Sequence, residues 1–316
     1  MSAILNSLDV VLQDGFMYAI LAMGYYVSYT ILDFPDLTVE GTVLSGGVTF
    51  GLLVRVGVNP WIAMIAAFAV GFIFGSITGF LHVKLKIRPL LCGILVSTAL
   101  ISVNLVVSVV GMGGNWSGDG ALSTIDLGRS VTTLLRTFPA NLLPQDFYGF
   151  NIRKLLTFFV IALACKLLLD FYLKTKNGLL LRATGSNSQF VTMLAKDQRV
   201  SKVLGIAIGN GLAAVSGALI AQSRGNANQG MGIGMVVIGL ASLIIGLSVF
   251  GKIRFMKPTT MVILGSVIYQ ACLGIATLLG VPSAYNKIIM AALFTFALIF
   301  SESMSRKRGM SDDRTQ

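Results

Sequence analysis

The stretch from Trp61 to Val83 reads WIAMIAAFAVGFIFGSITGFLHV and contains no aspartate, glutamate, lysine or arginine. A helix needs about 20 predominantly apolar residues to cross a bilayer, so this stretch is long enough to span a membrane. The rest of the chain is similar: 55% of its 316 residues are hydrophobic and 12% are charged. Its mean hydropathy is +0.82. These values exclude a soluble globular fold and predict an all-α, multi-pass membrane protein.

Apolar runs of comparable length recur along the chain and predict about nine transmembrane helices in one domain, residues 1–316. Helices are expected because backbone polar groups inside hydrocarbon must be satisfied within the segment. The expected spans are Gly15–Leu32, Thr38–Val56, Trp61–Val83, Leu90–Gly111, Leu155–Leu173, Val203–Gln222, Gly232–Phe250, Thr259–Leu279 and Ala284–Phe300. Glu40 and several glycines interrupt the second segment. It is therefore either a lipid-facing helix or a broken or re-entrant helix that lines a cavity.

The distribution of basic residues predicts the orientation of the chain. Clusters of lysine and arginine follow the third, fifth, seventh and ninth segments, for example at Lys84–Arg88 and Arg306–Arg308. The positive-inside rule places these clusters and the C-terminus in the cytoplasm, and the N-terminus outside. Residues 112–153 then form an external loop and residues 174–202 a cytoplasmic loop. The external loop either docks an outside partner or packs as a lid over its own helices.

Small residues at four-residue spacing predict where the helices approach one another closely. Two such ridges are present, one in the third segment and one in the sixth. Their glycines are Gly71, Gly75 and Gly79, and Gly205, Gly209 and Gly217. Small side chains let helix backbones come together, which drives association in lipid. The ridges either hold the bundle together or form a sliding contact between moving helices.

Several function classes are excluded by residues that the chain lacks. His82 is the only histidine, so the chain has neither a histidine pair for a metal nor a histidine-based nucleophile system. The stretch Gly246–Ile253 matches GxxxxGK but ends in isoleucine, where a nucleotide-binding loop needs serine or threonine for Mg²⁺. We therefore expect no enzyme activity, metal, cofactor or ATP site on this chain. The net charge of +11 lies at helix ends and suits anionic lipid, so nucleic acid is not an expected partner.

Five polar side chains fall inside the expected spans and are candidates to line a translocation path. They are Glu40, Asn104, Asn210, Gln222 and Gln270. Intramembrane polar groups usually face a bundle interior or a cavity. Each of them also has a simpler interpretation, as the partner in a hydrogen bond between helices.

The expected cytoplasmic loop contains the polar stretch Leu181–Asp197, LRATGSNSQFVTMLAKD. Ser186 followed three residues later by Gln189 is a capping-box pattern, with Gly185 before it as a turn, and predicts a short helix that begins at Ser186. On that helix Phe190, Met193 and Leu194 share one apolar face. The face either inserts into a groove of a soluble partner or lies on lipid.

The run Arg182–Asn187, RATGSN, resembles the cytoplasmic coupling segment of permeases from the branched-chain amino-acid and ribose family of bacterial ABC importers. The resemblance covers nearly the whole chain and includes the span Gly239–Gly251. It also includes Asp33–Gly41, DFPDLTVEG. This last run resembles a subgroup associated with amino acids, aromatic ones among them, more than the sugar permeases.

The resemblance implies a permease subunit of the bacterial cytoplasmic membrane that imports a small solute and works as a homodimer or with a close paralogue. It implies two cytoplasmic ATPase subunits, which hold ATP and magnesium, and an external solute-binding lipoprotein. The residues that would contact the ATPases are Arg182, Thr184, Gly185, Ser186, Asn187, Phe190, Met193 and Leu194. The alternative is a stand-alone secondary transporter. Its best coupling charges, Glu40 and Asp170, lie toward helix ends.

Overall fold

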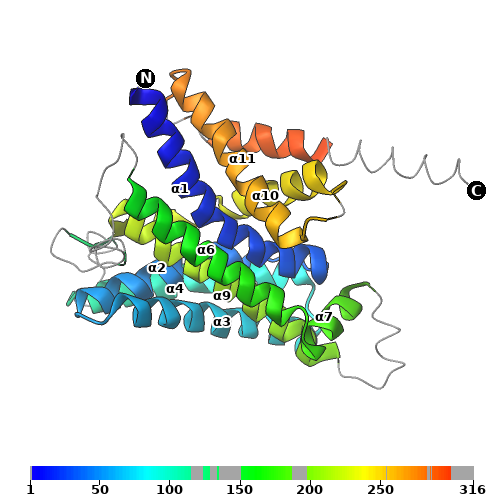
Figure 1. The fold of residues 1–316 in the computed structure, drawn as a ribbon. Coiled ribbons are helices and arrows are strands. Elements are labelled where there is room, and N and C mark those ends of the chain that lie inside the picture. The colour runs from blue at the N-terminus through cyan, green and yellow to red at the C-terminus, as the bar shows by residue number, and fades with distance from the viewer. Residues whose placement is uncertain are drawn as a thin grey trace, which may run out of the picture.

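Seven helices in the computed structural model are long and apolar enough to cross a membrane, and they pack against one another in a bundle (Figure 1). The structure describes residues 2–114, 124–128, 134, 151–186, 198–253, 255–282, 285 and 287–299. The helices are α1 (Ser2–Tyr25), the π-helix η1 (Tyr26–Ile31), α2 (Thr38–Arg55), α3 (Pro60–Leu85), α4 (Pro89–Gly111), α6 (Ile152–Tyr172), α7 (Lys176–Ser186), α9 (Gln198–Arg224), the 3₁₀-helix η3 (Gln229–Gly232), α10 (Met235–Phe250) and α11 (Pro258–Leu278). A helix over Lys287–Ile299 follows.

The nine expected spans correspond to seven candidate spans and two other helices. The candidate spans are Ser7–Ile31, Pro60–Leu85, Pro89–Gly111, Ile152–Tyr172, Gln198–Arg224, Gln229–Phe250 and Pro258–Leu278. Of the two other helices, Lys287–Ile299 is shorter than the about 20 residues that a span needs. The second is α2, which is less apolar than the candidate spans. The count of nine is therefore not confirmed, and the orientation of the termini stays a prediction.

Helix α2 is one uninterrupted α-helix of 18 residues, so the break considered for this segment is absent. Its glycines serve close packing: a Cβ at Gly46 would overlap the backbone of Ala214, and a Cβ at Gly47 would lie 2.9 Å from the Met231 side chain. Most of α2 is buried, and it packs against α3, α4 and α9. Contact with protein in place of lipid explains why this helix carries small and polar residues.

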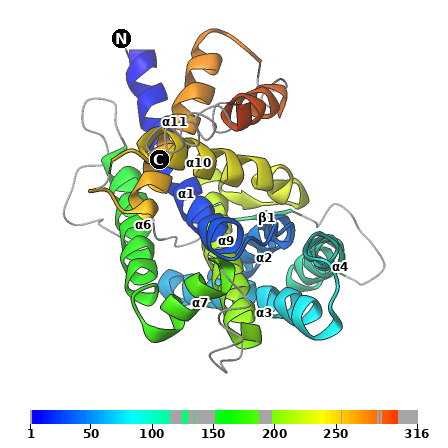
Figure 2. The same ribbon diagram turned by 90° about the vertical axis from the view of Figure 1, so that its right-hand side faces the viewer.

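Helix α9 is the buried centre of the bundle and packs against α1, α2, α3 and α7 (Figure 2). On one side, Gly71 and Gly75 of α3 lie so close to Asn210 that a Cβ on either would clash with it. On another side, Gly217 leaves no room for a Cβ beside the carbonyl of Val43 in α2. These glycines allow α9 to lie between α2 and α3 at near-backbone distance.

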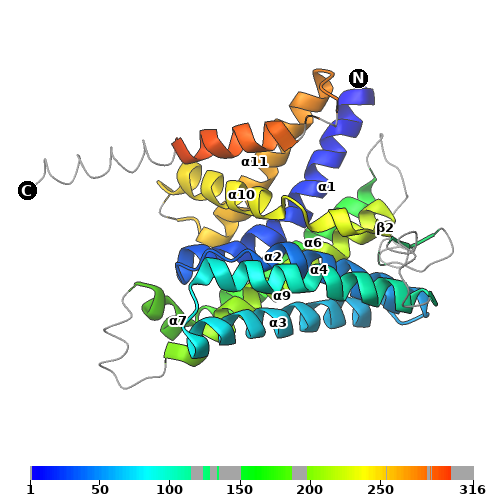
Figure 3. The ribbon, with the colours of Figure 1, turned by 180° about the vertical axis from the view of Figure 1, so that it is seen from behind.

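The two ends of the bundle carry different structures (Figures 1 and 3). At one end, β1 (Ile125–Asp126) pairs antiparallel with β2 (Asn226–Ala227), just beyond α9. The amide of Leu134 adds a 3.0 Å hydrogen bond to the side-chain oxygen of Gln222. Ile125 and Leu134 are thus held against the helices, and both interpretations of residues 112–153 stay predictions. At the other end lies α7.

Candidate functional site

The segment expected to couple to ATPases begins within α7, which corrects one expectation from the sequence. Gly185 lies inside this helix, so the turn expected there is wrong. Gly185 packs on η1, where a Cβ would overlap the carbonyl oxygen of Ile31. Ser186 is the last residue of α7, and the short helix expected to begin there, with Asn187, Phe190, Met193 and Leu194, lies outside the described residues.

Helix α7 is held firmly against the ends of α1 and α9. Leu181 is fully buried, and its side chain fills the space over Gly205, where a Cβ would lie 2.7 Å from it. Thr184 is also buried, and its hydroxyl donates to the carbonyl of Leu180 at 2.8 Å. Arg182 is exposed. A displacement of α7 must therefore move η1 and the start of α9, because close-packed interfaces shift as units and do not deform gradually.

A buried polar cluster lies where the connection between η1 and α2 meets α3 and α9. We call it the Asp36 knot, and it is formed by Asp36, Thr38, Thr42, Thr78 and Asn210. The Asp36 carboxylate accepts from the amide of Thr38 at 2.9 Å and from the side-chain amide of Asn210. The Thr42 hydroxyl donates to the side-chain oxygen of Asn210 at 3.0 Å, and the hydroxyls of Thr38 and Thr78 share a 2.9 Å hydrogen bond. The knot ties the connection between η1 and α2 to α2, α3 and α9.

Asp36 is 1% exposed, and the described residues include no cation within ion-pair distance of it. Burial raises the pKa of its carboxyl group above 3.8, because a charge loses its hydration there. The hydrogen bonds from Thr38 and Asn210 lower that pKa, but burial is the larger effect. The bond from the first amide of α2 is local, but the other partner of Asp36, on α9, lies 174 residues away and has no local sequence signal.

Four of the five path candidates hydrogen-bond to residues distant in sequence. Besides Asn210 in the knot, Glu40 accepts from the amide of Gly234 at 3.0 Å, and Asn104 donates to the carbonyl of Gly41 at 3.3 Å. Gln222 accepts from Leu134, as described above. The side-chain nitrogen of Gln270 is buried without a partner among the described residues. These bonds tie α2 to α4, α9 and the start of α10, and they do not bring the five residues to one point.

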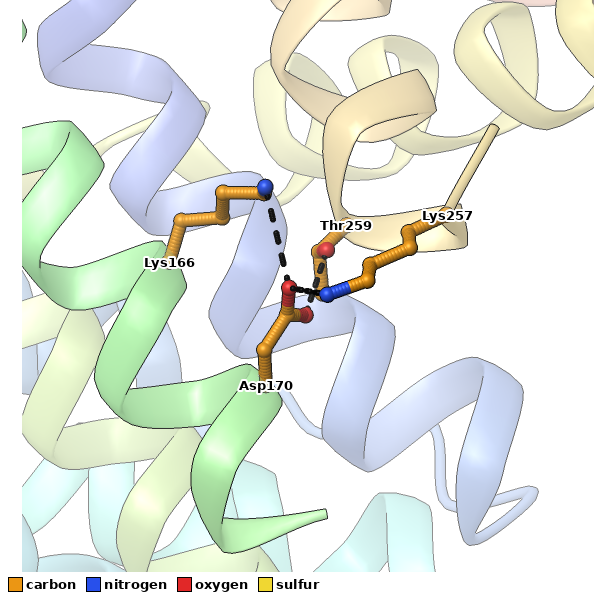
Figure 4. Close-up of polar contacts among 4 residues, drawn as sticks. All are labelled: Lys166, Asp170, Lys257 and Thr259. Carbon is orange, nitrogen blue, oxygen red and sulfur yellow. Dashed lines mark hydrogen bonds and ion pairs between the residues drawn. The ribbon is translucent and has the colours of Figure 1, made fainter. Parts of the chain in front are cut away.

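Asp170 forms a second polar junction, at the end of α6 nearest α7 (Figure 4). Its carboxylate accepts from Thr259 at 2.7 Å and from Lys257 at 3.1 Å, and Lys166 lies 3.6 Å away on the same helix. Thr259 is in the first turn of α11. Asp170 therefore joins α6 to the start of α11 and is fully engaged by its neighbours.

The chain also has a cleft of about 560 Å³ between α3, α6 and α9. Its lining is almost wholly apolar and includes Phe68, Leu169 and Leu212. Such a lining suits hydrocarbon and not a charged solute, so we do not assign the solute path to it. Among the described residues, no group of three or more histidine, cysteine, aspartate or glutamate side chains could hold a metal ion.

Comparison with known proteins agrees with this architecture. Residues 7–298 match the family described as the branched-chain amino acid transport system permease component. The chain is 36% identical to a tyrosine transport system permease protein of Clostridioides difficile (strain R20291) over 281 residues, which are 89% of this chain and 86% of that protein. It is 31% identical to the uncharacterized protein RP368 of Rickettsia prowazekii (strain Madrid E) over 93% of this chain and 97% of that protein. No solved structure matches.

The family match covers nearly the whole chain, and the candidate spans lie almost entirely within it. The protein is therefore a multi-pass transport permease of the bacterial cytoplasmic membrane, and it belongs to the family of branched-chain amino acid transport system permease components.

Proposed function

We propose that this chain is the membrane-spanning subunit of an ATP-driven importer for an aromatic amino acid such as tyrosine. The observation that carries the proposal is the 36% identity to a tyrosine transport permease over 89% of the chain. A likeness of this extent covers most of the chain, so it supports a shared mechanism as well as a shared fold.

The complete transporter combines this chain with partners that supply energy and substrate. Two permease chains, identical or closely related, bind two cytoplasmic ATPase subunits that carry ATP and Mg²⁺. An external solute-binding lipoprotein delivers the amino acid. The sequence supports this division of labour, because its GxxxxGK stretch lacks the residue that would hold Mg²⁺. In this arrangement residues 1–316 form one transmembrane domain, with residues 112–153 outside and residues 174–202 facing the ATPases.

The proposed mechanism is alternating access driven through α7. Closure of the ATPase pair displaces the segment from Arg182 to Leu194, and the contact between Gly185 and Ile31 passes the displacement to η1. The contact between Leu181 and Gly205 passes it to α9. Because α9 runs through the centre of the bundle, its movement changes the path on both sides of the membrane. Asn210 and Gln222, both on α9, are the path candidates that this movement would displace most directly.

The stand-alone secondary transporter is the less favoured function. Its coupling residue would have to bind and release an ion, yet Asp170 is engaged by two lysines and a threonine. Glu40 caps the backbone at Gly234. Both carboxylates therefore have structural partners that account for their presence.

Transport by purified components tests the proposed function. Proteoliposomes that contain the permease with its ATPase and solute-binding protein should accumulate tyrosine only when ATP is present on the side of the membrane that carries the ATPase subunits. Uptake by the permease alone, driven by a proton gradient, would overturn the proposal. The double variant Phe190→Asp, Met193→Asp should lose co-purification with the ATPase subunit. Thr192→Asp adds a charge on the opposite face of the same expected helix and should keep it.

A further inference from the structure

Charged and phenolic side chains gather at the end of the bundle opposite α7, where α9 finishes. Arg224 is the last residue of α9 and is exposed, and its guanidinium donates to the hydroxyl of Tyr18 at 3.0 Å. Tyr18 lies on α1 and is only 4% exposed. Arg224 therefore joins the surface to a phenol inside the bundle.

Two further groups belong to this site. Asp14 precedes Tyr18 by one helical turn, so the two side chains share a face of α1. The Asp14 carboxylate interacts electrostatically with Arg224, yet its oxygens form no ion pair with the Arg224 guanidinium, which would need an N–O distance of 4.0 Å or less. Tyr269 of α11 is the other group: α11 packs along α1, where Ser266 donates a 2.8 Å hydrogen bond to the carbonyl of Gly15, the residue after Asp14. The positive and negative groups thus face the same region without neutralising each other directly.

The same region contains a buried hydrogen-bonding group that lacks a partner among the described residues. The Tyr269 side chain is fully buried, and its hydroxyl has no such partner. Buried polar groups are nearly always satisfied by protein, water or a bound solute. This unpartnered phenol, close to an Asp14 and an Arg224 that form no ion pair with each other, indicates a site that receives a polar molecule.

We propose that Arg224, Asp14, Tyr18 and Tyr269 form a receiving site for the zwitterionic end of a free α-amino acid. Arg224 binds the carboxylate, because the guanidinium fork matches carboxylate geometry. Asp14 binds the ammonium group, and the two phenols complete the hydrogen bonds. The site rests on the proposed function, to which it adds the part of the substrate that the permease itself recognises.

The location of the site fits this role. Arg224 lies on the side of β1 and β2, at the end of the bundle that the basic-residue pattern assigns to the outside, where a binding protein would release its solute. Tyr18 and Asp14 lie on α1, whose other end carries η1, and Arg224 lies on α9. η1 and α9 both contact α7, so a displacement of α7 reaches both halves of the site.

Thermal unfolding of the purified full-length permease in detergent tests the site directly. L-tyrosine at millimolar concentration should raise the melting temperature of the wild type. Tyramine, which lacks the carboxylate, and 3-(4-hydroxyphenyl)propionate, which lacks the ammonium group, should not. Arg224→Gln should abolish the shift and Arg224→Lys should restore part of it. Arg55→Gln removes another arginine, from the end of α2 on the same side, and should leave the shift intact.

Two results would overturn the proposal. Equal stabilisation by 3-(4-hydroxyphenyl)propionate and by tyrosine would show a site for anions in general. A shift that persists in both Arg224→Gln and Asp14→Asn would show that tyrosine binds elsewhere. Uptake by the reconstituted complex separates these failures from a failure of the proposed function. If the wild type imports tyrosine with ATP while Arg224→Gln imports it with unchanged KM and maximal rate, the receiving site alone is wrong.

Discussion

Asn210, on the central helix α9, donates a hydrogen bond to the carboxylate of Asp36, which lies in the short connection between η1 and α2. The two residues are 174 positions apart in the chain and both are buried. Their bond fixes the connection between η1 and α2 to α9, the helix that packs against α1, α2, α3 and α7. The Asp36 knot therefore lies between α7 and the rest of the bundle, and changes to it should affect stability and transport together.

Removal of the Asp36 side chain should destabilise the protein more than its conversion to asparagine. Asp36→Ala leaves the buried backbone amide of Thr38 without its acceptor, at a cost of about 1–3 kcal/mol, whereas the Asn210 side-chain amide keeps its bond to the carbonyl of Ile206. Asp36→Asn keeps one acceptor oxygen and should cost less. Thermal unfolding in detergent measures both. Equal melting temperatures for the wild type and Asp36→Ala would contradict the role of the knot.

The raised pKa of Asp36 predicts a specific dependence of stability on pH. The native state binds the proton more tightly than the unfolded state, so this group favours folding fully below the ordinary pKa of 3.8. That contribution is lost as the pH rises from 3.8 through the raised pKa of the folded state. The difference in melting temperature between Asp36→Asn and the wild type should therefore shift in favour of the variant over this interval. A difference that is independent of pH would argue against a buried carboxyl group.

A side chain at position 185 should uncouple α7 from the transport helices. Gly185→Val places a Cβ where the carbonyl oxygen of Ile31 lies, so α7 must move away from η1. Typical coupling free energies between sites correspond to about 5- to 150-fold, and we expect ATP-dependent uptake to fall by about tenfold or more. Gly230→Ala is the matched control, because its nearest neighbour would lie 3.4 Å from the new Cβ. ATPase activity of the complex should continue without uptake.

The Asp170 junction should contribute unequally through its two partners on the α11 side. Lys257 is half-exposed, so its pairing with Asp170 should be worth about 0.2–1 kcal/mol and should weaken in high salt. The bond from Thr259 is better shielded and has a charged acceptor, so it should contribute about 1.5–3 kcal/mol. Double-mutant cycles of Asp170→Ala with Lys257→Ala and with Thr259→Val measure the two terms. A salt-sensitive Thr259 coupling, or a larger Lys257 one, would reverse this assignment.

Hydropathy predicted seven spans well because each depends only on its own residues, which must satisfy their backbone groups without outside help. Of the expected span Ala284–Phe300, the described residues include a helix over Lys287–Ile299. Hydropathy left the integrity of α2 open, since the sequence alone does not reveal that Gly46 packs against Ala214, a residue 168 positions away. The π-helix at Tyr26–Ile31 carried no sequence signal that we used.

The candidate site was less predictable than the fold, for a related reason. The turn expected at Gly185 rested on a local pattern, but Gly185 lies inside α7 and packs on η1. Glu40, Asn104 and Asn210 were identified as intramembrane polar groups, but their partners depend on how each helix is rotated. That rotation is set by packing between helices that are distant in sequence.

The pairing of Ile125 and Asp126 with Ala227 and Asn226 also determines the order in which the protein can be assembled. The first strand leaves the ribosome about a hundred residues before its partner, which at about 5–20 residues per second is a delay of roughly 5–20 s. Throughout that interval Ile125 lacks the strand that pairs with it and Leu134 lacks its hydrogen-bond acceptor Gln222, because β2 and the end of α9 do not yet exist. The pairing of β1 with β2 is therefore a late event in biogenesis. A protease present during synthesis should cleave the region around β1 until the two strands pair, and no longer afterwards.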